Sequence, residues 1–240
     1  MKYITFYFHR ELREHFGLKY PLEYVLQRRA SIKDIIEALG VPHTEVGEIL
    51  AEEREAGFDH IPSPDEKIVV RPVEAPVDVT RPTLLRPNLY PEVKFIADVN
   101  VGKLAMLLRM LGQDTLWSNS YGDREVAALA AQERRIVLSR DRGLLKRREI
   151  VHGRLIRDCN PDDQLSEVAR LYGLDLDCRF SRCLRCNQIL KPVPKSDIVH
   201  RLKPRTRTYY EYFEICPGCE RIYWRGSHWE KMCTRIQNSG

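Results

Sequence analysis

The hydrophobic and polar pattern of the first part of the chain predicts a small mixed domain. A β-branched and aromatic run at 3–8 indicates a strand, and a shorter run at 20–26 is expected to pair with it. Ser31 has the chemistry of a helix N-cap and precedes apolar residues at helical spacing. The apolar run 68–70 predicts a closing strand. We therefore expect a β-grasp domain over residues 1–75.

A proline-rich stretch covers residues 76–91. Proline lacks a backbone donor and disfavours helix, so such a stretch is typical of an extended segment. We expect it to link two domains.

From residue 92 to residue 177, apolar strand patterns alternate with helical ones. Strands are expected at 93–97, 115–117, 135–139 and 154–157, and helices at 104–111, 123–130 and 161–172. Alternation of this kind predicts a parallel sheet with helices on both faces, and hence the α/β class.

Residues 178–240 contain two C-x-x-C pairs, which are formed by Cys183, Cys186, Cys216 and Cys219. The interval of 29 residues between the pairs is longer than usual, but a zinc ribbon can carry a hairpin there. Four thiolates complete a tetrahedral site, so we expect a structural zinc ion. An aromatic strand is expected at 209–213, after a segment in which basic residues alternate from 201 to 207.

Charge is distributed unevenly along the 240 residues, whose net charge is +5. Residues 178–240 carry 13 Lys and Arg against 5 Asp and Glu, whereas residues 1–91 carry 12 against 15. A basic C-terminal part favours a polyanionic partner such as RNA, and a solvated basic surface is the plainer alternative.

The sequence contains no apolar run of 18 residues and no secretory leader pattern. We therefore expect no membrane partner and a cytoplasmic location.

Acidic residues follow the expected strands of the central part. Asp98 and Asp141 come at the ends of the first and third strands, and Asp123 opens the helix after the second. Asp158, Asp162 or Asp163 could supply a fourth acid. Ligand sites of open α/β sheets lie at the carboxyl ends of strands, so we expect these acids to converge. Clustered carboxylates suit Mg²⁺ or Mn²⁺, although each acid alone could be a helix cap or turn residue.

Two stretches of the central part carry a resemblance to a known family. Residues 95–115 resemble the opening of the Mut-seven C-terminal RNase domain, a PIN-like nuclease family, and 136–145 resemble its second motif. Asp162-Asp163-Gln164-Leu165 is similar to the third motif, and the paired C-x-x-C module to the zinc ribbon that ends the family. Residues 35–46 resemble the ubiquitin-like domain that precedes it in many members.

The resemblance implies a PIN fold and metal-dependent hydrolysis of RNA. It implies Asp98 and Asp141 as Mg²⁺ or Mn²⁺ ligands, and Asp98, Asp123, Asp141 and Asp163 as catalytic acids. Asn100 and Ser139 are candidates for orienting waters at the metal, or for a cap and a strand-end hydroxyl.

Four basic residues are candidates for holding the RNA backbone: Lys103, Arg109, Arg140 and Arg142. Ordinary surface charge is the alternative for each. The zinc ribbon is expected to assist RNA binding, and the ubiquitin-like domain to dock a protein partner or position RNA. A non-catalytic RNA-binding or adaptor protein with the same fold is the main alternative function. The sequence leaves open the RNA substrate, endo- or exonucleolytic cleavage, and the oligomeric state.

Overall fold

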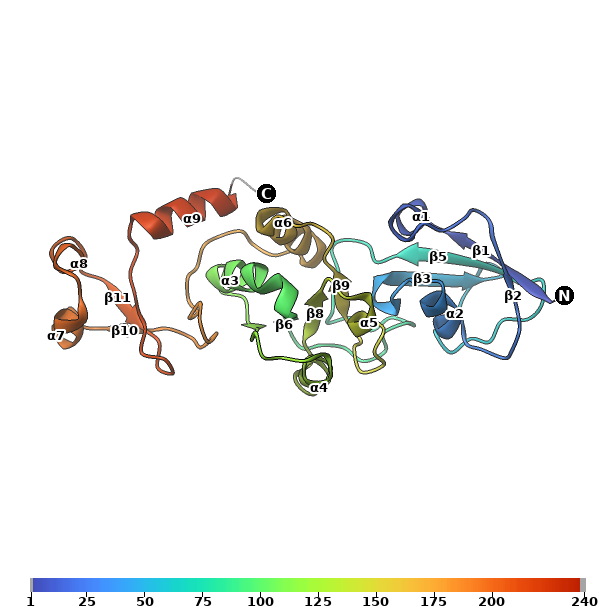
Figure 1. Cartoon of the computed structure of the whole chain (residues 1–240), viewed down its shortest axis with the longest axis horizontal. Helices are drawn as coiled ribbons and strands as arrows, with labels where there is room; N and C mark the ends of the chain where they lie inside the picture. The colour runs from blue at the N-terminus through green and yellow to red at the C-terminus, as the bar shows by residue number, and fades with distance from the viewer. Residues whose placement is uncertain (1, 238–240) are drawn as a thin grey trace.

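The structure is a computed structural model that describes residues 2–237. Three parts lie in a row: an N-terminal sheet, a central parallel sheet and a C-terminal ribbon (Figure 1). No helix in the described part of the chain is long and apolar enough to cross a membrane.

The N-terminal part is a five-stranded sheet in the order β2-β1-β5-β3-β4. Its elements are β1 (Tyr3–Phe8), α1 (Arg10–Phe16), β2 (Leu22–Val25), α2 (Ile32–Ala38), η1 (His43–Glu45), β3 (Val46–Ala51), β4 (Arg54–Glu55) and β5 (Lys67–Pro72). The first and last strands pair in parallel at the centre, as in a β-grasp domain. Ser31 caps α2 as predicted: its side chain accepts from the Asp34 amide, and Asp34 accepts from the Ser31 amide in return. The sequence analysis did not anticipate α1, β3 or β4.

The central part is a four-stranded parallel sheet in the order β7-β6-β8-β9. Its elements are β6 (Phe95–Ala97), η2 (Val99–Val101), α3 (Gly102–Met110), β7 (Thr115–Leu116), α4 (Asp123–Glu133), β8 (Ile136–Ser139), α5 (Arg142–Leu145), β9 (Gly153–Leu155) and α6 (Pro161–Tyr172). This confirms the predicted α/β arrangement of a parallel sheet with flanking helices.

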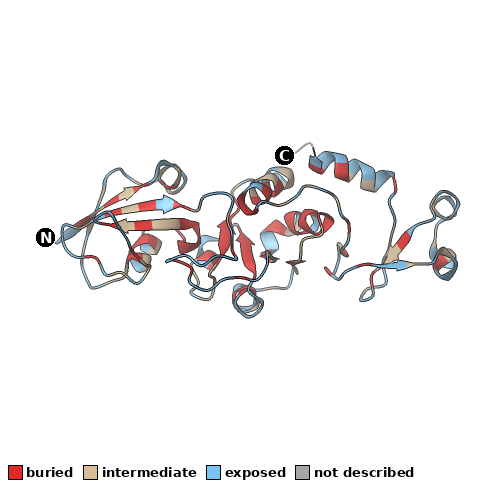
Figure 2. Cartoon of the chain, turned by 180° about the vertical axis from the view of Figure 1, so that it is seen from behind, coloured by how far each residue is buried: buried red, intermediate tan, exposed pale blue. Residues whose placement is uncertain are grey.

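Alternating residues of the central strands pack into two separate apolar clusters, one on each face of the sheet. On β6, Phe95 and Ala97 pack with α3 and α6, whereas Ile96 packs with α4 and α5. The strands are therefore buried on both faces, which is visible as continuous red in Figure 2. Burial from both sides leaves the strand ends as the accessible edge of the sheet.

The proline-rich segment packs along both neighbouring parts. Val79 and Tyr90 belong to the central core, and Leu85 belongs to the core of the N-terminal sheet. Arg86 is buried, and its guanidinium donates to the backbone carbonyls of Val46, Thr44 and other residues on both sides. The segment therefore acts as a strap between the two domains.

The C-terminal part begins with a three-stranded antiparallel sheet, β10-β11-β12. Its elements are β10 (Lys191–Val193), α7 (Lys195–Ile198), η3 (Val199–Arg201), α8 (Pro204–Tyr209), β11 (Phe213–Ile215), β12 (Ile222–Tyr223) and α9 (Ser227–Gln237). The predicted strand over 209–213 is wrong in extent, because a short helix continues to Tyr209 and the strand begins only at Phe213.

Helix α9 returns from the ribbon to the central part, where it lies near α6 (Figure 1). Cys233 and Ile236 join the central core, and Arg235 pairs with Asp162 at 2.6 Å between Nε and Oδ2. The chain after the ribbon therefore stabilises the central domain.

Candidate functional site

Two of the predicted acids lie at the point where the strand order of the central sheet reverses. In the sheet, β7 lies on one side of β6 and β8 lies on the other. The strand order therefore reverses between the neighbouring strands β6 and β8. Asp98 directly follows β6, and Asp141 follows β8 by two residues. A crevice outside the carboxyl ends of adjacent strands at such a point is the usual ligand site of open α/β sheets.

The Asp98 side chain is buried, with 4% of the residue exposed, and is held by three donors. Its Oδ1 accepts from the Val99 amide at 2.6 Å. Its Oδ2 accepts from Asn100 Nδ2 at 3.1 Å and from Ser139 Oγ at 3.0 Å. Asn100 and Ser139 therefore fix the Asp98 carboxylate itself.

Ser139 connects the two strand-end acids. Its Oγ donates to Asp98 Oδ2 and accepts from the Asp141 amide at 2.9 Å. Asp141 is exposed and caps α5, with its Oδ1 accepting from the Gly143 amide at 2.6 Å. Asp141, for which a turn residue was the alternative to a metal ligand, is therefore a helix cap, and Ser139 joins its backbone to the Asp98 carboxylate.

The other acids lie along the same edge but in more open positions. Asp123 is exposed in the first turn of α4, and Asp158 is exposed after β9. At the start of α6, exposed Asp163 accepts from Asn160 Nδ2 at 2.9 Å, whereas Asp162 pairs with Arg235. These contacts favour Asp158 or Asp163 over Asp162 as a fourth acid.

The acids do not form a tight three-carboxylate group. Within residues 2–237, the cysteines described below are the only set of three or more potential ligands whose atoms all lie within 4.8 Å of one another. Mg²⁺ usually takes one or two carboxylates and keeps several waters. Two carboxylates after adjacent strands, Asp98 and Asp141, are a donor set of this kind.

Three of the four predicted RNA-contacting residues are exposed near this edge. Lys103 lies in the first turn of α3. Arg140 donates to the Asp158 carbonyl at 3.1 Å. Arg142 stacks over the ring of Phe16, with 4.8 Å between its guanidinium carbon and the ring centroid. Phe16 belongs to α1, so the N-terminal domain contacts the edge of the site.

The prediction that Arg109 contacts the substrate is corrected by its burial. Only 1% of the residue is exposed, and its guanidinium donates to the carbonyls of Thr115, Leu184 and Arg185 at 2.8–3.0 Å. Burial lowers its pKa from the ordinary value, with nearby thiols opposing that effect. Arg109 therefore anchors the first cysteine turn to α3.

The four cysteines of the C-x-x-C pairs lie together, as predicted from their spacing. The Sγ atoms of Cys183 and Cys219 are 3.5 Å apart, and those of Cys186 and Cys216 are 3.3 Å apart. Zinc–sulfur bonds of about 2.3 Å give a tetrahedron with edges of about 3.8 Å. A small relaxation would therefore accommodate a zinc ion.

Tyr223 gives this cluster a neighbouring hydroxyl. Its Oη lies 3.1 Å from Cys183 Sγ. Burial opposes ionisation of the Cys183 thiol, but this hydroxyl and the amides of Cys186 and Arg185 outweigh it and lower the pKa to about 6. Thiolate is the form that binds metal, so Cys183 is suited to zinc, whereas burial and neighbouring thiols raise the pKa of Cys186 and Cys219.

The sequence analysis missed the residues that join the N-terminal domain to the site. Glu45 is buried against Arg154 and Arg157, which lie on or just after β9. His43 Nε2 contacts the Ile150 carbonyl at 2.7 Å. These pairs are more than a hundred residues apart in sequence, so no local pattern indicated them.

Comparison with known protein families gave two matches. The family described as Mut7-C RNAse domain matches residues 93–236, which is more than half of the chain. The family described as Mut7-C ubiquitin matches residues 1–78. No curated protein and no solved structure matched.

Proposed function

The chain belongs to the Mut7-C RNAse domain family, and we propose that it hydrolyses RNA phosphodiester bonds at the carboxylate edge of its central sheet. The observation that carries the proposal is the pair of acids at the strand-order switch, Asp98 and Asp141, linked through Ser139. The order of ubiquitin-like and RNase domains agrees with the family resemblance of the sequence.

In this proposal Asp98 and Asp141 hold a divalent ion, Mg²⁺ or Mn²⁺. Such an ion, when bound, supplies Lewis-acid stabilisation of phosphate charge and lowers the pKa of water. Asp98 is suited to be the fixed ligand, because three hydrogen bonds set its orientation. Asp123 and Asp163 are assigned to the outer part of the site, where they can bind water or position it.

Basic side chains at the same edge are assigned to the RNA backbone. Lys103 lies at the N-terminal turn of α3, where the helix dipole also favours a phosphate. Arg140 and Arg142 flank Asp141 in sequence and extend the positive charge beside it. The zinc ribbon is assigned a separate role in gripping RNA, supported by the 13 basic residues of 178–240.

The test is cleavage of end-labelled RNA by the full-length protein with Mg²⁺ or Mn²⁺. Asp98→Asn and Asp141→Asn should each lower the rate at least about a hundredfold, since each removes a charged ligand. Asp175→Asn is the matched control, because Asp175 is exposed and pairs only loosely, at 3.3 Å, with exposed Arg179. Its rate should stay within about twofold of the original protein.

Two outcomes would overturn the proposal. If the RNA binds but is not cut, and neither Asp variant changes binding, the protein is a non-catalytic RNA-binding protein with this fold. If cleavage persists in both variants at the rate of Asp175→Asn, the hydrolytic site lies elsewhere in the chain.

A further inference from the structure

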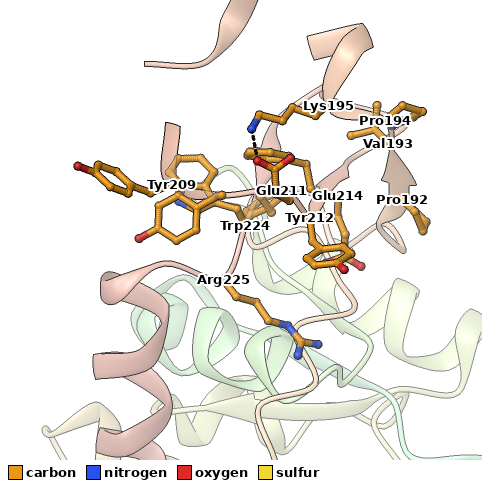
Figure 3. Close-up of a pocket in the computed structure, with 13 residues that line it drawn as sticks. Pro192, Val193, Pro194, Lys195, Tyr209, Glu211, Tyr212, Glu214, Trp224 and Arg225 are labelled. Atoms are coloured by element: carbon orange, nitrogen blue, oxygen red, sulfur yellow. Dashed lines mark hydrogen bonds and ion pairs between the residues drawn. The ribbon is translucent and has the colours of Figure 1, made fainter. Parts of the chain in front are cut away.

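The ribbon carries a groove that the nuclease site does not use. It has a volume of about 1040 Å³ and lies on the ribbon sheet, lined by residues of β10, α8, β11 and β12 and of the chain beside them. Figure 3 shows Tyr209, Tyr212 and Trp224 among its side chains. We propose that this groove binds an unpaired segment of RNA, whose bases stack on these three aromatic rings.

The aromatic rings in the groove are unusually exposed. Tyr212 is 91% exposed, Tyr209 75% and Trp224 36%. The neighbouring Phe213 shows the opposite behaviour: it is only 4% exposed and points into the ribbon. Tyr212 immediately precedes β11 and is almost fully exposed, so its side chain has no role in the core.

Trp224 is exposed yet held in place. Its ring centroid is 6.4 Å from that of Tyr210 and 6.3 Å from that of Phe213. The nearby Gly226 leaves room for it, since a Cβ there would come within 2.9 Å of Trp224 Nε1. A ring fixed on one side and open on the other is a suitable platform for a base.

The chain next to the groove is basic, which favours a polyanionic occupant. The segment from 198 to 210, which includes α8, contains Arg201, Lys203, Arg205 and Arg207 and no acidic residue. All four of these side chains are exposed. None of these four residues, which we call the basic lip, lines the groove itself, but Arg205 and Tyr209 are four residues apart on α8 and share a helix face. Basic residues next to exposed aromatic rings are the combination with which proteins bind single-stranded nucleic acid.

The two glutamates of the groove do not cancel this preference. Glu211 pairs with Lys195 at 2.5 Å. Glu214 lies near Arg225, whose charge offsets it. A proline-rich peptide could also dock on aromatic rings, but the basic lip favours a polyanion over that neutral ligand.

The proposal rests on the proposed function only in taking RNA as the ligand, and its test does not require cleavage. We would measure the affinity of fluorescein-labelled oligouridine for the full-length Asp98→Asn protein by anisotropy. Tyr212→Ala and Tyr209→Ala should each weaken binding about fivefold to a hundredfold, the equivalent of one lost base stack. Tyr3→Ala is the control, because Tyr3 is 42% exposed on the N-terminal sheet, and it should leave the affinity unchanged.

The basic lip and the groove can be tested separately. Arg205→Gln combined with Arg207→Gln should lower the slope of log affinity against log salt by about 1.4, since each phosphate contact on a single strand contributes about 0.7. Tyr212→Ala should leave that slope unchanged. In the cleaving protein, Tyr212→Ala should raise KM and leave kcat unaltered.

Three results would overturn the proposal. The first is an oligouridine affinity within about twofold of the parent in both tyrosine variants. The second is equally tight binding of an RNA duplex with the same dependence on the tyrosines. The third is binding of decaproline, lost in Tyr212→Ala, while oligouridine binding is retained. If the protein never cleaves RNA but the tyrosine variants still lose oligouridine binding, the result supports the groove and refutes only the proposed nuclease activity.

Discussion

A buried carboxylate makes several of the contacts between the N-terminal domain and the central domain. Glu45, at the end of η1, is 1% exposed. One of its oxygens accepts from the Leu155 amide at 2.8 Å. The other accepts from Arg154 at 3.0 Å and from Arg157 at 2.9 Å.

Glu45→Gln should destabilise this contact strongly. The NH₂ group of the glutamine must face either the Leu155 amide or the two guanidinium groups. Because both are donors, a donor faces a donor in either orientation. Removing one partner of a buried ion pair lowers the free energy of unfolding by about 3–5 kcal/mol. Arg154 keeps its 2.6 Å pair with Glu167, so the lower end of that range applies. For a chain of this size, about 3 kcal/mol lowers the midpoint of thermal unfolding by about 6–12 °C.

Glu48→Gln is the matched control. Glu48 lies on β3, three residues further along, and makes one ion pair with Arg71 at 2.6 Å. Both side chains are substantially exposed, so loss of this pair should cost less than about 1 kcal/mol.

The assay combines circular dichroism during heating with limited proteolysis of the strap, residues 76–91. Glu45→Gln should lower the apparent midpoint and speed cleavage of the strap, while Glu48→Gln should do neither. Equal midpoints for the two variants, with equal rates of strap cleavage, would refute the view that Glu45 holds the domains together.

Three further predictions follow from single groups. Cys183→Ser should abolish bound zinc, measured by metal analysis of the purified protein, whereas exposed Cys159→Ser should retain it. Ser139→Ala should raise the Mn²⁺ concentration for half-maximal cleavage by about 10–100-fold, because it frees the Asp98 carboxylate. Burial, aided by the nearby Arg86 charge, lowers the pKa of His152 to about 3. Below a pH of about 6.5, His152 binds a proton in the unfolded chain but not in the folded protein. The free energy of unfolding should therefore fall by up to about 1.4 kcal/mol per pH unit from there toward pH 3. Urea midpoints measured at pH 7 and pH 5 should differ less in His152→Phe than in the original protein.

The central sheet could be predicted because its strands and helices carry strong local patterns. The helix at 104–111 is a clear example, since its apolar residues recur at helical spacing. The same pattern contained the information that Arg109 is buried. Positions 105, 108 and 109 lie on one face of the helix, so an arginine at 109 falls among core residues. Two of its three carbonyl partners are some 75 residues away, which only the structure shows.

Elements with weak patterns were missed or misplaced. Helix α1 buries a single leucine, Leu12, and therefore has no apolar periodicity to detect. The end of α8 was predicted to belong to the aromatic strand over 209–213, although Pro204 stands at the first helical position, where proline is favoured. The proline content of the strap predicted a linker, and composition does not show that its apolar residues enter two cores.

The edge of the candidate site depends on both domains, which changes what the N-terminal domain is expected to do. A parallel sheet brings Asp98 and Asp141 together by topology, so the acids alone need only the central part of the chain. The basic residues beside them depend on α1 as well. Phe16 supports the guanidinium of Arg142, and His15 Nε2 accepts from Arg157 Nη1 at 3.0 Å. Since the N-terminal domain is also fixed to β9 through Glu45, it is placed to orient the cations around the carboxylates, in addition to any partner that it binds.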